Sequence, residues 1–268
     1  VMLTYILAQT LLAIGFAGTV LNQFLKLLFR IPRPWVLDSD FTIVESARAQ
    51  ATGYSFPSGH SQNAIGTFGG IARFTRRKWV RVAAIVVAVL VPLSRMYLGV
   101  HTPLDVGVAA VIAVALVFAL YPLMERSDSR HGVMGAVLAV MLALAVGYLL
   151  FVSLYPFPAD VDAANLASGV ENAWKLLGAT VGMLVGWWLD VRFIHFDTRA
   201  VWYVQLIKLV GGLALLLGIR AALKAPLAAA LGAGAGGAVR YGVMVLFAAA
   251  VWPMVFAPLC HALEKRVY

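Results

Sequence analysis

Long apolar runs are the feature that most constrains this sequence. An α-helix needs roughly 20 mostly apolar residues to cross a bilayer. Seven stretches meet this requirement closely: residues 3–25, 82–98, 104–124, 133–155, 173–190, 201–219 and 239–259. Because 62% of the residues are hydrophobic and only 12% are charged, too few polar side chains remain to cover a water-facing surface. The sequence therefore predicts an all-α fold, a polytopic transmembrane helix bundle.

An eighth segment, residues 59–75, is shorter and more polar than the others. Five basic residues follow or end it: Arg73, Arg76, Arg77, Lys78 and Arg81. Cytoplasmic loops of membrane proteins are enriched in Lys and Arg, so this loop is expected on the cytoplasmic side. If 59–75 crosses, the residues before it and those after span 82–98 share the opposite side. We therefore expect about eight spans, with the Ala/Gly-rich stretch 225–238 as a connecting loop.

The net charge of +9 does not indicate nucleic-acid binding. The basic residues lie between apolar runs rather than in a patch interleaved with aromatic side chains, so a nucleic-acid partner is excluded. The single cysteine, Cys260, cannot form a disulfide within one chain. Residues 1–30 lack the basic start and the small-residue cleavage site of a secretory signal peptide.

Three short motifs on the expected non-cytoplasmic side carry most of the chemistry-capable side chains. Their residues are Lys26, Arg33 and Pro34, then Pro57, Ser58, Gly59 and His60, then Ser94, Arg95, His101 and Asp105. Each motif alone has an ordinary explanation, such as cations that snorkel to the interface or helix N-caps at Ser58 and Thr102. The combination is not explained this way, because an unpaired charge such as Arg95 near the bilayer costs several kcal/mol.

These residue types suit the chemistry of a phosphate ester. Arginine offers a bidentate fork to phosphate oxygens and lysine a point charge. Gly59 lets the backbone approach a ligand, and the N–H groups of the following helix point at an anion. Asp105 lies four residues after His101 at a helix start, so its carboxylate can fix the tautomer of the imidazole. His60 remains as a proton donor to the leaving oxygen.

The pattern K-x6-R-P, P-S-G-H and S-R-x5-H-x3-D resembles the signature of the type 2 phosphatidic acid phosphatases. This superfamily includes bacterial lipid phosphatases, glucose-6-phosphatases and the vanadium haloperoxidases. All eleven signature positions are present in order and at the family's internal spacing. The resemblance implies that the substrate phosphate is bound by Lys26, Arg33, Arg95, the Ser58 hydroxyl and the Gly59 N–H.

The resemblance also implies catalytic roles for His101, His60 and Asp105. His101 attacks phosphorus and forms a phosphohistidine, while Asp105 orients it. His60 protonates the leaving oxygen and then activates water. The cations stabilise the transition state, so no metal and no other cofactor is expected.

The resemblance divides the chain into two parts. Residues 1–125 are expected to form the phosphatase core that carries all three motifs, and residues 126–268 to form additional C-terminal transmembrane helices. Family members usually have two spans before the first motif, whereas this sequence has one. No chemistry is assigned to the second part.

The sequence thus predicts an integral-membrane lipid phosphatase. Its substrate is expected to be a lipid phosphate monoester or a polyprenyl diphosphate, and a soluble sugar phosphate stays open. The expected location is a bacterial cell membrane, with the site facing the periplasm or exterior. Two alternatives remain: a lipid phosphotransferase, and a lipid transporter or scaffold whose site is vestigial. Haloperoxidase activity is disfavoured, because those relatives are soluble proteins.

Outside the signature, loop 35–56 is expected to be a partly helical cap over the site. Its aromatic residues Trp35, Phe41, Tyr54 and Phe56 could shape a lipid entrance. Gln62 and Asn63 are expected to contact the headgroup or to pack. Lys208 lies within a span and is expected to snorkel or pair rather than to belong to the site.

Overall fold

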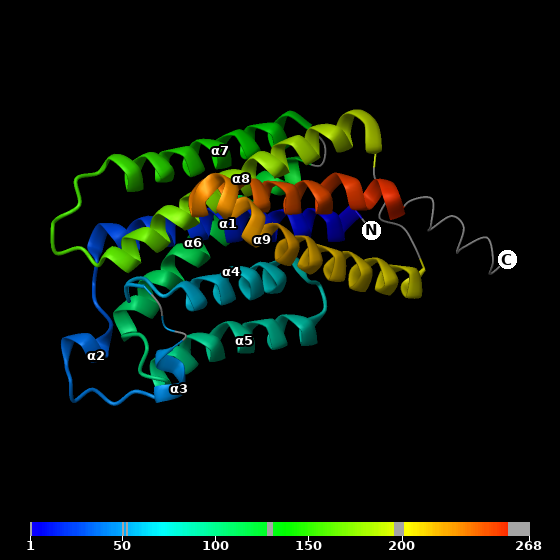
Figure 1. The fold of residues 1–268 in the computed structure, drawn as a ribbon. Helices are drawn as coiled ribbons and strands as arrows, with labels where there is room; N and C mark the ends of the chain where they lie inside the picture. Colours follow the sequence, from blue (N-terminus) through cyan, green and yellow to red (C-terminus); the bar gives the residue numbers. More distant parts are fainter. Residues whose placement is uncertain (1, 50, 52, 128–130, 196–200, 257–268) are drawn as a thin grey trace. The chain divides into compact units, whose positions relative to one another are not determined.

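The computed structural model describes the chain except for residues 1, 50, 52, 128–130, 196–200 and 257–268. Over the described residues it is helical and contains no strand (Figure 1). The helices are α1 (Met2–Phe29), α2 (Pro34–Leu37), α3 (Glu45–Arg48), α4 (Gly59–Phe74), α5 (Lys78–Tyr97), α6 (Pro103–Ser127), α7 (His131–Leu154), α8 (Ala163–Leu189), η1 (Asp190–Ile194), α9 (Trp202–Leu246) and η2 (Phe247–Val251). Within the described part, six helices are long and apolar enough to cross a membrane. The predicted all-α membrane bundle is confirmed.

The chain forms two compact units. Residues 2–137 and 150–169 make up the first, here called the N-terminal unit. Residues 138–149 and 170–268 make up the C-terminal unit. All three sequence motifs belong to the N-terminal unit.

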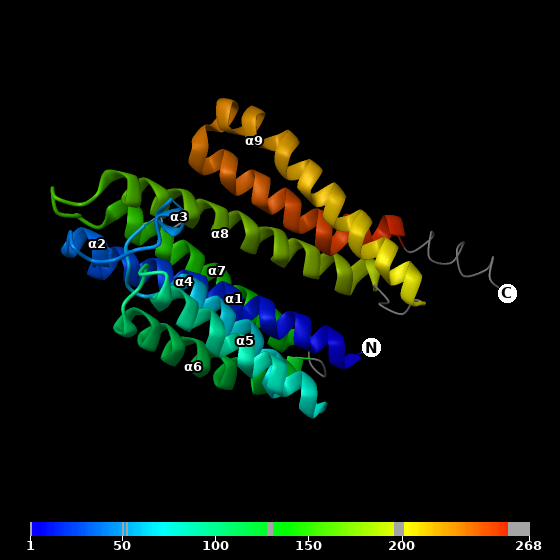
Figure 2. The same cartoon turned by 90° about the horizontal axis from the view of Figure 1, so that it is seen from below.

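Helix α4 is the centre of the N-terminal unit and packs against α1, α5 and α6 (Figure 2). Its 16 residues span only about 24 Å, less than the roughly 30 Å of a bilayer's hydrocarbon core. Ser61, Gln62 and Gly66 are among its buried residues. Because neighbouring helices cover it, α4 does not need the apolar surface of a lipid-facing helix. This explains why its sequence is the most polar of the eight predicted segments.

The helix directions bring the three motifs to one end of the N-terminal unit. Helix α1 ends and α4 begins at this end, and α5 ends where α6 begins, close to α2 and α3 (Figure 1). Helix α4 runs away from this end and α5 returns to it. The basic residues around the α4–α5 loop therefore lie at the opposite end from the motifs.

The segment between α1 and α4 folds as a partly helical cap, as predicted, with α2 and α3 as its two short helices. The cap is fixed to the α5–α6 turn, where the Val44 N–H donates to the Leu98 carbonyl at 3.2 Å. Gly99 has a φ of +72°, and a Cβ there would lie 2.6 Å from the Thr42 carbonyl oxygen. The cap thus lies directly on the backbone of the turn that carries His101.

The prediction of a loop at 225–238 was wrong. This stretch is helical apart from Gly232, whose φ of 78° and ψ of 169° lie in a region essentially restricted to glycine. Residues 202–231 and 233–256 thus form a hairpin that reverses at one residue (Figure 2). A helix in lipid keeps its backbone hydrogen bonds internal, so a glycine-rich stretch is more costly as a loop there than as a helix.

Within the C-terminal unit, α8 packs closely against the second leg of this hairpin. Gly178, Gly182 and Gly186 recur every four residues of α8. A Cβ on Gly178 would lie 1.9 Å from the Ala238 carbonyl oxygen, so only a glycine fits there. Such small-residue stripes allow close contact between membrane helices.

We predict that Gly99→Ala destabilises the N-terminal unit by about 2 kcal/mol or more. A left-handed φ and a clash with the cap backbone both oppose the added methyl group. Thermal unfolding in detergent measures the effect. Gly107→Ala on α6 is the matched control, because a Cβ there has nothing within 4 Å. Equal unfolding midpoints for the two variants would contradict the contact between cap and turn.

Candidate active site

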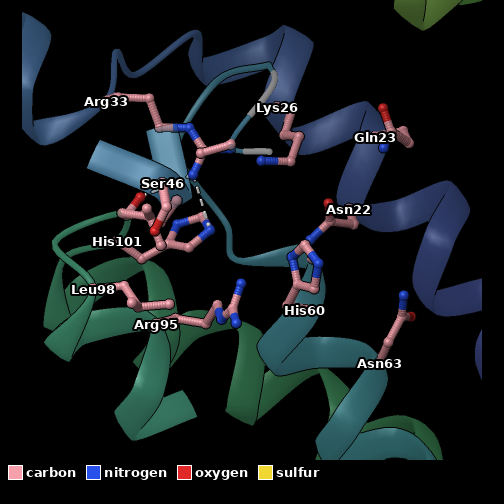
Figure 3. A pocket seen from close by; sticks show the side chains of 14 residues that line it. Asn22, Gln23, Lys26, Arg33, Ser46, His60, Asn63, Arg95, Leu98 and His101 are labelled. Carbon is pink, nitrogen blue, oxygen red and sulfur yellow. Dashed lines mark hydrogen bonds between the residues drawn. The ribbon is translucent and has the colours of Figure 1, made fainter. Parts of the chain in front are cut away.

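A cavity of about 410 Å³ lies where the three motifs meet, beneath the cap. Its walls come from α1, the cap, the start of α4 and the α5–α6 turn, and Figure 3 shows the lining side chains. Six of the eight predicted site residues line it: Lys26, Arg33, Gly59, His60, Arg95 and His101. His60 and His101 face each other across the cavity, with Lys26 and Arg33 along one side and Arg95 along another (Figure 3).

Arg33 is buried, with 8% of its surface exposed, and it bonds three residues of two other segments. Its Nε donates to the Gly53 carbonyl at 3.0 Å. Its Nη1 lies 2.8 Å from the Val100 carbonyl oxygen and 3.0 Å from Nε2 of His101. Arg33 therefore ties the cap to the turn that carries the second histidine.

The contact with Arg33 identifies the tautomer of His101. A guanidinium group can only donate hydrogen bonds, so Nε2 of His101 must be the acceptor. The ring proton of the neutral imidazole is then on Nδ1. The Nε2 lone pair accepts from Arg33, and this tautomer is the form that a nucleophile requires.

Asp105 lies behind His101 rather than in the cavity. Its Oδ2 atom is 3.5 Å from Nδ1 of His101. The same oxygen accepts from the Thr102 N–H at 2.8 Å and from the Ser55 hydroxyl at 2.6 Å. In return the Asp105 N–H donates to Thr102 Oγ1 at 3.2 Å, so the carboxylate is also part of the N-terminal cap of α6.

Lys26 is held by main-chain carbonyl oxygens of the segment that precedes the second motif. Its ammonium group donates to the carbonyls of Tyr54 and Ser55. We call residues 53–55 the strap, because its three carbonyls bind Lys26 and Arg33. Carbonyls are neutral, so these contacts do not neutralise the charge of either cation.

Arg95 projects into the cavity from the last turn of α5. Its Nε atom is buried and has no hydrogen-bond partner among the described residues. A buried donor without a partner is costly unless a ligand supplies one. Nε of Arg95 is thus a donor that the described residues leave available for a ligand.

Ser58 does not line the cavity. It is the N-cap of α4, fully buried, and its hydroxyl lies 2.9 Å from that of Ser61. The ordinary N-cap role considered for Ser58 therefore describes its hydroxyl in this structure. Its N–H donates to the Asp105 carbonyl at 3.1 Å, which joins the second motif to the third.

A buried amide network fixes the start of α4 to α1. Asn22 donates through Nδ2 to the Pro57 carbonyl at 3.2 Å and to Gln62 Oε1 at 3.0 Å. Gln62 in turn donates to the Gly18 carbonyl. Gln62 therefore packs rather than contacts a headgroup, whereas Asn63 lines the cavity. Asn22, which also lines it, carries no sequence signal that would have identified it.

The surroundings of His101 lower its pKa below the usual value of about 6.5. Burial of the imidazole is the largest cause, and the positive charges of Arg33 and Lys26 act in the same direction. The hydrogen bond with Asp105 opposes them. His101 is therefore neutral at pH 7, in agreement with its hydrogen bond from Arg33.

The α7–α8 loop contributes to this region although it carried no sequence signal. A second cavity, of about 560 Å³, shares Arg33 with the first and is lined also by Trp35, Asp160 and Asp162. The Asp162 N–H donates to the Tyr54 hydroxyl at 3.2 Å. The loop after α7 is thus hydrogen-bonded to the strap.

The aromatic residues proposed for a lipid entrance do not form one group. Tyr54 and Phe56 are buried and support the strap, whereas Phe41 is exposed on the cap. Lys208 belongs to the C-terminal unit, where its ammonium lies 5.9 Å from the ring centroid of Phe256.

No group of three metal-ligating side chains occurs in the part of the chain that the structure describes. The metal-free site stays a prediction.

Comparison with protein-family models shows to which superfamily the chain belongs. Residues 6–129 match the family model of the PAP2 superfamily. Residues 174–265 match a second model, described as the transmembrane extension of PAP2 superfamily phosphatases. The chain belongs to the PAP2 superfamily. Together with its six apolar helices, the second match makes it an integral membrane protein.

Curated proteins similar to this PAP2 chain are phosphatases. The undecaprenyl-diphosphatase BcrC of Bacillus subtilis is 32% identical over 40% of this chain and 52% of its own length. An undecaprenyl-diphosphatase of Sulfolobus acidocaldarius is 36% identical over 35% and 45%. Phosphatidylglycerophosphatase B of Bacillus subtilis is 37% identical over 30% and 43%. The chain spans about half the length of the curated relatives it matches, and no solved structure matches it.

We predict that Arg33→Lys destabilises this PAP2 chain by about 2–3 kcal/mol. One ammonium group cannot replace the bonds to Gly53, Val100 and His101, and bonds from charged donors contribute about 1.5–3 kcal/mol each. Ligand-free thermal unfolding in detergent measures the loss. Arg30→Lys is the control, because the Arg30 guanidinium bonds the nearby carbonyls of Leu27 and Leu28 at the end of its own helix. An equal loss in both variants would contradict a special role for Arg33.

Proposed function

We propose that the chain is a membrane lipid phosphatase that acts through a phosphohistidine on His101. The observation that carries the proposal is the hydrogen bond from Arg33 to Nε2 of His101 inside a cavity lined by Lys26 and Arg95. An unprotonated ring nitrogen thereby lies beside the place where three cations would hold a phosphate. This arrangement supports nucleophilic attack on phosphorus.

In the first step, Nε2 of His101 forms a bond to phosphorus and the bond from phosphorus to the leaving oxygen breaks. Lys26, Arg33 and Arg95 stabilise the charge on the equatorial oxygens. His60, across the cavity, gives its proton to the leaving oxygen. The Gly59 N–H, at the start of α4, is a further donor to the phosphate. A phosphate dianion favours the protonated form of His60.

In the second step, water attacks phosphorus and the bond to His101 Nε2 breaks. His60, now neutral, takes a proton from the water. Phosphate leaves, and His101 regains its free lone pair. Asp105 stabilises the positive charge on the imidazole while it carries the phosphoryl group, and the Nδ1 proton stays in place throughout.

A lipid is the substrate class that fits a site at the membrane surface, because the leaving group can stay in the bilayer. Two relatives are named undecaprenyl-diphosphatases, so polyprenyl diphosphates are the first candidates. The basic residues around the α4–α5 loop lie at the far end of the N-terminal unit. The positive-inside rule therefore supports a site on the non-cytoplasmic face.

We predict that purified protein releases phosphate from a polyprenyl diphosphate or another lipid phosphate, and that His101→Asn lowers kcat at least ~10³-fold. The assay is a panel of lipid phosphates and diphosphates in detergent, with EDTA present. His195→Asn makes the same change at an exposed histidine of the C-terminal unit and should keep full activity.

Three outcomes of this panel would contradict parts of the proposal. Activity of His101→Asn near that of the wild type would exclude the nucleophile. A strict requirement for added Mg²⁺ would exclude the metal-free mechanism. Phosphate found on an added lipid alcohol, rather than in solution, would identify a phosphotransferase.

The lowered pKa of His101 predicts the acid limb of the pH profile. The nucleophile must be neutral, so the limb on which His101 becomes protonated should have its midpoint below the usual imidazole pKa of about 6.5. Steady-state rates between pH 4.5 and 8 give the midpoint. Two substrates with different headgroups are compared, because a limb that belongs to the enzyme has the same midpoint for both. A midpoint above 6.5 would contradict a buried, neutral His101.

A further inference from the structure

Ser55 is a buried hydroxyl at the centre of the site that the sequence motifs do not include. It is 1% exposed and belongs to the strap. Its N–H donates to the Ile31 carbonyl at 2.8 Å, and its own carbonyl accepts from Lys26. The backbone of Ser55 is thus fixed from both sides, which limits where its side chain can lie.

The Ser55 hydroxyl lies between the two members of the histidine–carboxylate pair. Its Oγ is 2.6 Å from Oδ2 of Asp105 and 3.4 Å from Nδ1 of His101. The direct distance from Nδ1 to Oδ2 is 3.5 Å, at the outer limit of a hydrogen bond. The Ser55 hydroxyl is therefore in short contact with the carboxylate, whereas the imidazole is not.

The directions of these bonds follow from the chemistry of the partners. An ionised carboxylate can only accept, so Ser55 donates its proton to Asp105. Its lone pairs are then left for the proton on Nδ1 of His101. That proton has two acceptors, Oγ of Ser55 and Oδ2 of Asp105. Both acceptors favour the tautomer in which Nε2 is unprotonated.

We propose that Ser55 is a positioning residue that fixes the orientation of His101, and the hydrogen bond of its Nδ1–H, through its hydroxyl bridge to Asp105. Only the predicted changes in kcat and in the pH profile rest on the proposed function. No bond to Ser55 is made or broken in either step. The Ser55 hydroxyl also donates a hydrogen bond to Asp105 and so partly offsets the negative charge of the carboxylate. The carboxylate therefore attracts a proton to the imidazole less strongly.

The test is Ser55→Ala, compared with wild type. We expect kcat to fall ~10–100-fold, as for other residues that orient a reacting side chain, with KM within ~3-fold. Without the serine proton, Asp105 attracts the imidazolium form more strongly. The acid limb of kcat/KM should therefore move to higher pH.

Two further variants separate positioning from simple packing. Ser55→Thr keeps the hydroxyl, and its acid limb should return to the wild-type pH. The midpoint of the acid limb does not depend on the amount of folded protein. It can therefore be measured even if the extra methyl group lowers the stability of Ser55→Thr. Thr19→Val is the control: it removes a hydroxyl bonded to the Gly15 carbonyl at 2.7 Å within α1, outside the cavity, and should change neither kcat nor the limb.

A spectroscopic readout tests Ser55 without relying on activity. NMR of protein labelled with ¹⁵N-histidine reports the tautomer of each imidazole, and His101→Asn assigns the His101 signals. We expect Nδ1–H in both proteins, because Arg33 still donates to Nε2, and in Ser55→Ala a shifted Nδ1–H signal of His101, because its hydrogen bond to Oγ is lost. If the wild type releases no phosphate from any lipid, the proposed function fails. The NMR spectrum then still tests whether Ser55 positions His101.

Two results would overturn the proposal. The first is an unchanged His101 Nδ1–H signal in Ser55→Ala. The second is a lower unfolding temperature of Ser55→Ala with unchanged kcat per folded molecule and an unchanged acid limb. The second result would make Ser55 a packing residue only.

Discussion

Arg33 connects three segments that are far apart in the chain. Its guanidinium is buried and is bonded to Gly53, Val100 and His101. Leaving a buried charge without partners costs several kcal/mol, so these segments must meet around it. Because two of the partners are neutral carbonyls and the third is an imidazole, Arg33 retains its charge for an anion. The geometry of the remaining site follows from this arrangement.

The helices behind the site hold it in place through close contact and buried amides. Gly66 and Gly70 of α4 leave room for Ile14 and Leu11 of α1, since a Cβ at either glycine would lie within 3 Å of those side chains. The Asn22–Gln62 pair then bonds the start of α4 to α1. Small residues permit the approach and the polar network sets its register, so the start of α4 is positioned where His60 faces the cavity.

The residues that could be predicted are those whose chemistry is unusual for a membrane segment. Lys26, Arg95 and Asp105 are charged near apolar runs, and their spacing relative to the histidines is distinctive. Ser55 and Asn22 are ordinary residues, and only their neighbours in space give them significance. The stretch 225–238 was misjudged because glycine and proline usually mark loops in water, whereas it continues a helix up to the single turn at Gly232.

Several properties of this protein depend only on local composition and can be read from the sequence. Apolar runs specify helices for a bilayer, loop charges indicate their direction, and motif spacing identifies the superfamily. Which atoms face the cavity depends instead on contacts between segments that are distant in the chain. Ser58 points to Ser61, Arg33 reaches Nε2 of His101, and Ser55 lies between His101 and Asp105. The Arg33 and Ser55 bonds join residues 46 to 68 positions apart, so they depend on how helices and cap pack, which no local pattern encodes.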